Sequence, residues 1–279
     1  MPVRRSLGPR ALLCRAVAGA ALAMPAIVVL AGAGGASGTQ LAVGLPGPAD
    51  LGLAPAVRGP AVQVGPTLQL PTTPIYYYRG RTDARTVALT FDAGSDRGYA
   101  AEILDLLKTR GLHVTFGITG HWAVENPDLT KRMVDEGHSF INHTYHHDSL
   151  TGFATHKPPQ SADTIRAELD DTEAAVHRIT GGTTKPWFRP PYGDMDARTI
   201  GAVAADGYPF IAMQTVDSLG WKGLAPDTVV QRCVTKAEPG AIYVLHVGSQ
   251  STDYAALASI IDQLTAAGYT IGGIPAVTN

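Results

Sequence analysis

Ionisable side chains recur where short, apolar, β-prone segments of this chain end. The positions are Asp92, His143, His147, Arg189, Asp217 and His246, which follow the segments 86–91, 139–142, 187–188, 210–213 and 241–245. In barrels of alternating strands and helices, catalytic residues lie at the ends of the strands, where the loops begin. A chance distribution of acids and histidines would instead favour helix surfaces. The positions therefore predict one site, assembled from several strand ends.

Two of these residues have a spacing that suits a metal ion. His143 and His147 are four residues apart, so a helical turn would place both imidazoles on one side, close enough to share a divalent ion. A histidine pair at this spacing is by itself a weak signal, and a structural role is the alternative. Its place at a strand end favours the metal, with His146 pointing elsewhere.

The remaining residues of this set suit hydrolysis of an amide or ester. Such a reaction needs a base that activates water and an acid that protonates the leaving group, and Asp92 and His246 fit these roles. Arg189 and Asp217 are expected to form a buried ion pair that orients Asp92, with a purely structural salt bridge as the alternative. The loop of Tyr192 is stiffened by prolines, and its backbone N–H suits a developing oxyanion.

The segments between these positions alternate between strand and helix patterns from residue 86 onward. Apolar residues at helical spacing over 98–110, 161–180 and 253–267 predict helices, and glycines follow their ends. Seven strands are expected, with helices between most of them. This alternation predicts a parallel sheet in an α/β fold, and the number of units indicates a distorted, incomplete (β/α) barrel.

Composition excludes several classes of protein. The chain has 279 residues, a formal net charge of −2 and no basic block, which argues against nucleic-acid binding. Its two cysteines cannot form a disulfide framework, and no zinc-finger spacing occurs.

The first eighty residues differ from the rest. Arginines at positions 4, 5, 10 and 15 precede the apolar run 16–33, and no charged residue follows until Asp50. This pattern predicts a signal peptide over 1–35 or, if it is not cleaved, a membrane anchor that tethers the protein. Pro25 and the weak hydrophobicity of the alanines favour cleavage. A Pro/Gly/Ala-rich linker is expected over 36–80 and the catalytic domain over 81–279. Because of the N-terminal signal pattern, we expect a secreted or cell-envelope protein.

The motifs that carry these residues resemble those of the polysaccharide deacetylases, carbohydrate esterase family 4, over about residues 86–274. They are Thr90-Phe91-Asp92-Ala93-Gly94, His143-Thr144-Tyr145-His146-His147, Arg189-Pro190-Pro191-Tyr192-Gly193, Asp217-Ser218-Leu219-Gly220-Trp221 and Val244-Leu245-His246. The order and spacing of five motifs make the resemblance specific. It implies the incomplete barrel of the NodB-type deacetylases.

The resemblance also implies a role for each matching position. Asp92 would be the general base and His246 the general acid, His143 and His147 would bind Zn²⁺ or a similar cation, Tyr192 would supply the oxyanion N–H, Arg189 and Asp217 would tune Asp92, and Trp221 would shape the acetyl pocket with Leu245 beside it. The metal would polarise the acetyl carbonyl and its water.

Two positions depart from the family pattern. The third metal ligand of the family is the second Asp of the first motif, where this chain has Ala93, and the second Asp of the fourth motif is Gly220. Losing a carboxylate should weaken metal binding, because a catalytic zinc normally has three protein ligands. Water, Asp92 or Asp96 could fill the place, or the site could bind metal poorly. We expect a working site with a relaxed metal shell.

The expected substrate is an N-acetylated glycan outside the cytoplasm. Peptidoglycan ranks first, chitin-like polymers second and acetylated xylan third, since the motifs describe the reacting centre and not the sugar subsites. Ala93 keeps open a carbohydrate-binding pseudoenzyme that has lost its metal, and a secreted amidase for small nitrogen compounds is a third class.

Overall fold

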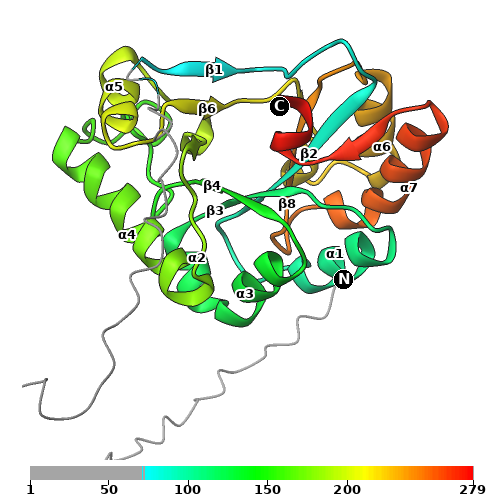
Figure 1. Ribbon diagram of the computed structural model, residues 1–279, viewed down its shortest axis with the longest axis horizontal. Coiled ribbons are helices and arrows are strands. Elements are labelled where there is room, and N and C mark those ends of the chain that lie inside the picture. The colour runs from blue at the N-terminus through cyan, green and yellow to red at the C-terminus, as the bar shows by residue number, and fades with distance from the viewer. Residues whose placement is uncertain (1–70, 72, 279) are drawn as a thin grey trace, which may run out of the picture. The chain divides into compact units, whose positions relative to one another are not determined.

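The computed structural model describes residue 71 and residues 73–278, and the elements named here lie in that part of the chain. The strands are β1 (Ile75–Tyr77), β2 (Thr86–Ala93), β3 (Thr115–Ile118), β4 (Ser139–Asn142), β5 (Trp187–Phe188), β6 (Phe210–Ala212), β7 (Val216–Asp217), β8 (Ile242–His246) and β9 (Thr270–Gly272). The α-helices are α1 (Ala100–Thr109), α2 (Gly120–Glu125), α3 (Pro127–Asp135), α4 (Ala162–Thr180), α5 (Ala197–Ala205), α6 (Pro226–Thr235), α7 (Asp253–Ala266) and α8 (Ile274–Thr278). Figure 1 shows their arrangement.

The strands form one parallel sheet, in the order β1-β6-β5-β4-β3-β2-β8-β7, with β9 beside the start of β2. The edge strands β1 and β7 are not paired with each other, so the barrel is incomplete. An antiparallel bridge between Arg79 and Ala241 links the chain after β1 to the start of β8. The α/β fold with a parallel, incomplete barrel is confirmed.

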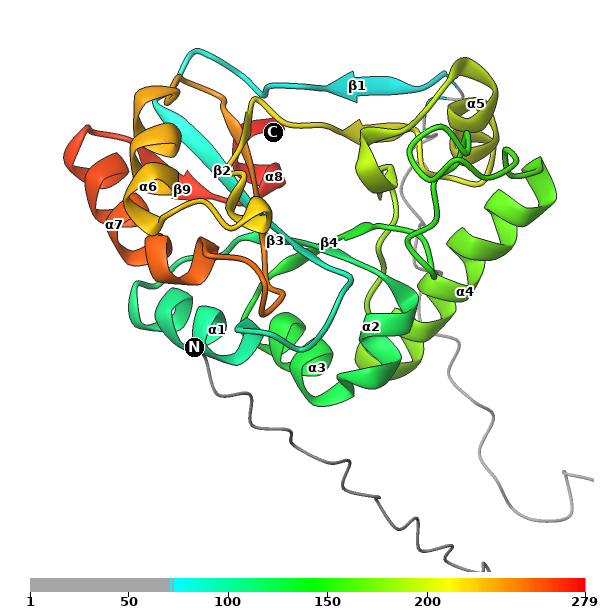
Figure 2. The ribbon, with the colours of Figure 1, turned by 180° about the vertical axis from the view of Figure 1, so that it is seen from behind.

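The buried apolar residues of the described part form three clusters around the curved sheet, one of which packs α4 and α5 against β5 and β6. Alternate residues of β2 point to opposite faces, so Val87, Leu89 and Phe91 pack into the large cluster that includes the helices, while Ala88 faces inward. The inner cluster is smaller, and Val277 of α8 belongs to it. Figures 1 and 2 show the larger helices along the outside of the sheet. The inner face is therefore filled at one end, which leaves the strand ends at the other for a site.

Local sequence signals set the ends of two helices. Ser161 caps α4 by accepting a hydrogen bond from the N–H of Thr164 at 3.1 Å, and Gly181 ends the helix with a left-handed φ of 72°. Asp196 caps α5 in the same way, at 2.7 Å from the N–H of Thr199.

The sheet holds more strands than the seven expected. β1 lies within the range 36–80 that composition predicts as linker, yet it pairs with β6. The sheet therefore begins six residues before the predicted domain boundary, because β1 is only three residues long and gives no periodic signal. The segment 1–35 and most of the predicted linker lie outside the described residues. Across residues 71 and 73–278, no helix has both the length and the apolar character needed to cross a membrane.

Candidate active site

The strand ends bring the predicted site residues together at one rim of the sheet. A pocket of about 560 Å³ opens there. Of the predicted residues it is lined by Asp92, His143, His147, Arg189, Tyr192, Asp217, Trp221 and His246. Asp92 and His246 are direct partners in the register of β2 and β8, so their backbones lie side by side. Residues far apart in the sequence thus form one site, as the strand-end pattern predicts.

Asp92 is buried and held by a cation. The Arg189 guanidinium donates from Nη1 to Asp92 Oδ1 at 2.6 Å, and its Nε donates to the carbonyl of Ala212 at 3.0 Å. Burial opposes ionisation of the Asp92 carboxyl, but the charge of Arg189 and its hydrogen bond outweigh burial and hold the pKa of Asp92 below the ordinary range. Asp92 is therefore a carboxylate at neutral pH, fixed in direction by Arg189.

Asp217 does not join this pair, contrary to the expected Arg189–Asp217 ion pair. Its carboxylate accepts hydrogen bonds from the N–H of Leu219 at 2.9 Å and from Nε1 of Trp221 at 3.3 Å. The reason is topological, since Asp217 ends the edge strand β7 whereas Arg189 follows β5, and four strands lie between β5 and β7 in the sheet order. Asp217 instead positions the Trp221 indole, which is 49% exposed at the pocket.

The two histidines meet, but not on the helical turn that their spacing suggested, because the segment 143–147 is a loop with left-handed φ values at Thr144 and His147. Their ring centroids are 4.7 Å apart, and the left-handed φ of 60° at His147 turns its side chain back toward His143. His143 Nδ1 lies 2.8 Å from the carbonyl oxygen of Arg189, so Nδ1–H donates there and Nε2 is left facing the site, 3.6 Å from Asp92 Oδ2. Burial lowers the pKa of both, that of His147 to about 3. Both are therefore neutral imidazoles, the form that binds metals.

A third metal ligand does not accompany them. Ala93 is fully buried in the helix-side cluster and offers no donor atom. Asp96, a candidate replacement, is engaged by Ser249, whose N–H donates to it at 2.8 Å and whose hydroxyl donates to its other oxygen. No group of three potential metal-ligating side chains occurs in the described part of the chain. The residues present therefore do not fit a catalytic zinc site with three protein ligands.

His246 contacts an acid that the sequence did not single out. Its backbone N–H donates to Asp253 Oδ2 at 2.8 Å, and its Nδ1 lies 3.5 Å from the same oxygen. Burial opposes protonation of His246, but Asp253, Asp92 and Asp217 outweigh it and raise the pKa. His246 thus retains a proton to higher pH than a free histidine. Two features of the sequence could have pointed to Asp253. It is an acid at the start of the helix that follows His246, and the fourth motif lacks its second acid at Gly220.

Tyr192 has an unusual backbone conformation, and its role as the oxyanion donor stays a prediction. Its φ of 61° places it in the left-handed region, which non-glycine residues rarely adopt. The ring is exposed and packs edge-on against His147, with centroids 4.7 Å apart. The strained turn thus carries Tyr192 into the pocket wall, a common feature of functional sites.

Leu245 is placed differently from the expectation that it lines the acetyl pocket. It is fully buried in the helix-side cluster, and Val244 lines the pocket in its place. Successive residues of a strand face opposite sides of the sheet, so Leu245 cannot share the face of His246.

The placement of Leu245 gives a stability prediction. We expect Leu245→Ala to lower the free energy of unfolding by about 2–5 kcal/mol through lost burial and a cavity, with the pocket wall intact. Urea denaturation measures this loss, and Val244→Ala is the matched control on the pocket face. A Leu245→Ala protein of unchanged stability would contradict the assignment.

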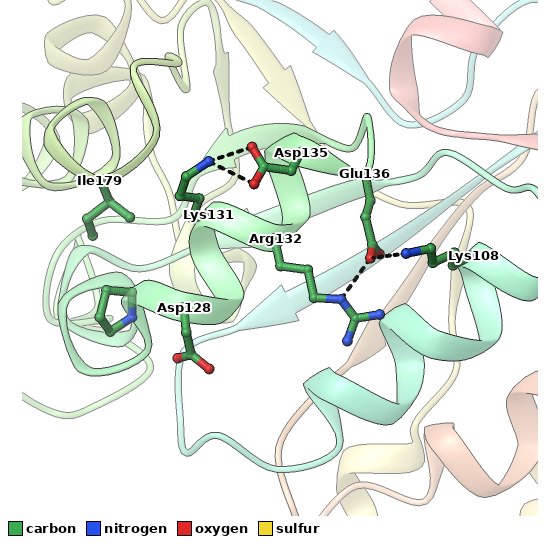
Figure 3. A pocket seen from close by; sticks show the side chains of 8 residues that line it. Lys108, Asp128, Lys131, Arg132, Asp135, Glu136 and Ile179 are labelled. Carbon is green, nitrogen blue, oxygen red and sulfur yellow. Dashed lines mark hydrogen bonds and ion pairs between the residues drawn. The ribbon is translucent and has the colours of Figure 1, made fainter.

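A second cleft lies elsewhere, between α1 and α3, and Figure 3 shows residues that line it. It has a volume of about 770 Å³, and its basic side chains all pair with carboxylates. Lys131 contacts Asp135 at 2.7 Å, while Arg132 and Lys108 contact Glu136 at 2.8 and 3.4 Å. Because these charges neutralise one another, the cleft lacks the converging acid and base of the strand-end pocket.

The fold and the strand-end site are those of a hydrolytic enzyme of the (β/α) class, and the comparisons with known proteins agree. The polysaccharide deacetylase family model matches residues 79–211. The chain is 35% identical to the peptidoglycan-N-acetylmuramic acid deacetylase PdaA of Bacillus subtilis over 71% of this chain and 73% of that protein. It is 31% identical to a peptidoglycan-N-acetylglucosamine deacetylase of Bacillus cereus, over 72% of this chain and 71% of that protein.

A solved structure extends this comparison. The wild-type form of a family 4 carbohydrate esterase (CE4) pseudoenzyme from Bacillus anthracis has a TM-score of 0.67 at 31% identity, covering 74% of this chain and 70% of that one. A mutant of that protein, described as having restored enzymatic activity, has a TM-score of 0.66. The chain belongs to the polysaccharide deacetylase family, whose hydrolases cleave N-acetyl amide bonds.

Proposed function

We propose that this protein removes N-acetyl groups from the sugars of peptidoglycan. The observation that carries the proposal is the pairing of Asp92 and His246 across β2 and β8, with opposite preferences for a proton. One group is kept ionised as a carboxylate and its neighbour keeps a proton, which is the arrangement that a general base and a general acid need.

The reaction follows from these two groups. Asp92 accepts a proton from a water molecule as the water oxygen bonds to the acetyl carbonyl carbon. The negative charge passes to the carbonyl oxygen, to which the Tyr192 N–H is the proposed donor. His246 then protonates the sugar nitrogen, the carbon–nitrogen bond breaks, and acetate and a free amine leave. The low pKa of Asp92 keeps it ionised but makes it a weak base, so its orientation by Arg189 is essential.

The choice of peptidoglycan rests on the relatives and on the pocket. Two relatives that match over more than two thirds of their length are named as peptidoglycan deacetylases, one for each of its two sugars. The exposed rings of Tyr192 and Trp221 flank the pocket, and flat aromatic faces suit the apolar faces of sugars. Chitin-like polymers and acetylated xylan are the alternative glycans.

We propose in addition that the protein acts outside the cytoplasm. The basic residues before the apolar run 16–33 have the pattern of a secretory signal or anchor, and peptidoglycan lies on that side of the membrane.

The test is release of free acetate from purified peptidoglycan. We expect release from peptidoglycan to exceed that from N-acetylglucosamine oligomers and acetylated xylan, measured after chelation and again with added Zn²⁺. Acetate release from one of the other glycans and not from peptidoglycan would show that peptidoglycan is not the substrate. The arms with and without Zn²⁺ show whether the two-histidine site needs the ion.

A second candidate is a glycan-binding pseudoenzyme, and the burial of Ala93 favours it. Without a third ligand the site lacks part of the family's catalytic set, and a CE4 pseudoenzyme is among the similar structures. Binding of peptidoglycan with no acetate released at saturating Zn²⁺ would support this alternative over catalysis.

A further inference from the structure

Asp253 lies directly behind His246 and is wholly shielded from solvent. It is the first residue of α7, and its Oδ2 accepts hydrogen bonds from the His246 N–H at 2.8 Å and from the Ser251 hydroxyl at 2.9 Å. A carboxylate removed from water needs compensating partners. Besides these two donors, the Asp253 carboxylate has the imidazole of His246 as a close neighbour.

Two buried polar atoms at this contact lack a hydrogen-bond partner within the described residues. They are Oδ1 of Asp253 and Nδ1 of His246. Nδ1 lies 3.5 Å from Asp253 Oδ2, so a small rotation of the ring or the carboxylate closes a hydrogen bond. A proton held on Nδ1 by this carboxylate leaves Nε2 as the atom that exchanges a proton with the substrate.

Gly220 supplies the space that Asp253 occupies. A Cβ added at Gly220 would lie 2.2 Å from Asp253 Oδ1 and 2.5 Å from Cγ, closer than atoms can approach. The two segments are also joined, because the Thr252 N–H donates to the Gly220 carbonyl at 3.3 Å. Gly220 has no positive φ, so space rather than backbone freedom accounts for the glycine.

We propose that Asp253 is the positioning residue of the general acid His246, and that its carboxylate fills the place left free where the fourth motif has Gly220. Asp253 holds the Nδ1 proton, fixes the ring and stabilises the imidazolium. The inference rests on the proposed function, since it gives His246 the acid role.

The effect of removing this carboxylate has a definite sign. Asp92, Asp217 and Asp253 face His246 and raise its pKa, so Asp253→Asn leaves two of the three charges and must lower it. We expect a fall of about one unit or more. As the pH rises, His246 then loses its proton at a lower pH than in the wild type. The alkaline limb of the kcat/KM profile therefore shifts to lower pH. KM should change little, because Asp253 is behind the ring.

The titration of His246 by NMR in the full chain tests this without any substrate. We expect the His246 resonance to titrate at lower pH in Asp253→Asn and unchanged in Asp227→Asn, an exposed acid in the first turn of α6 that serves as the control. Unaltered titration in a folded Asp253→Asn protein would overturn the proposal. Because no glycan is needed, this result stands apart from whether acetate is released.

Moving the carboxylate from position 253 to position 220 tests whether Asp253 fills the place that Gly220 leaves free. Gly220→Asp alone should destabilise the protein, since the new side chain meets Asp253. The double variant Gly220→Asp/Asp253→Ala should fold and return the His246 titration toward that of the wild type. If the double variant folds but its His246 titrates as in Asp253→Asn, the proposal that one carboxylate takes the place of the other is contradicted.

Discussion

Replacing Asp92 by Asn is expected to lower kcat/KM for acetate release by about 10³-fold, within the range for losing a general base. The amide keeps the size of the side chain and still offers an oxygen to Arg189 Nη1, but it cannot accept a proton from water. The measurement is acetate released per enzyme from peptidoglycan at several substrate concentrations.

The matched control is Asp128→Asn. Asp128 also pairs with an arginine, Arg97 at 2.7 Å, but it lies on α3 and lines the other cleft (Figure 3). This control should retain full kcat/KM. An Asp92→Asn protein with wild-type activity would remove Asp92 from the mechanism and leave the acid–base assignment without its base.

Replacing Ala93 by Asp is expected to raise the affinity for Zn²⁺ by about tenfold or more, since the family pattern has its third metal ligand at this position, where β2 ends. The same change places a carboxylate in an apolar cluster, which lowers stability in the absence of metal. Added Zn²⁺ should therefore raise the melting temperature of Ala93→Asp well above the shift in the wild type.

Calorimetric titration with Zn²⁺ and thermal melts with and without the ion measure both effects. Ala93→Asn is the control, because it has the same shape without the charge, and it should gain much less. Equal Zn²⁺ affinity in Ala93→Asp and the wild type would show that position 93 does not reach the two histidines.

The fold was predictable because its signals are local. The helical spacing of apolar residues, the cap at Ser161 and the glycine at 181 each act over one or two turns, and they set the positions of the helices. The strands β1 and β7 have only three and two residues, too short for a period, and their pairing depends on distant segments.

The site residues were predictable for a related reason, since strand ends meet at one rim whatever the strand order. Which of them touch depends on that order. Arg189 reaches Asp92 and not Asp217 because of where β5 and β7 lie in the sheet. Asp253 reaches His246 because it begins α7, and the sequence hinted at this contact only through its place at the start of that helix and the acid missing at Gly220.

Mass spectrometry of digested peptidoglycan, taken before and after treatment with the full-length protein, tests the central claim most directly. The account predicts fragments that have lost one acetyl group from a sugar and carry a free amine there, and predicts their absence after treatment with Asp92→Asn. Unchanged fragments after treatment with a folded wild-type protein that binds the glycan would contradict catalysis by Asp92 and His246.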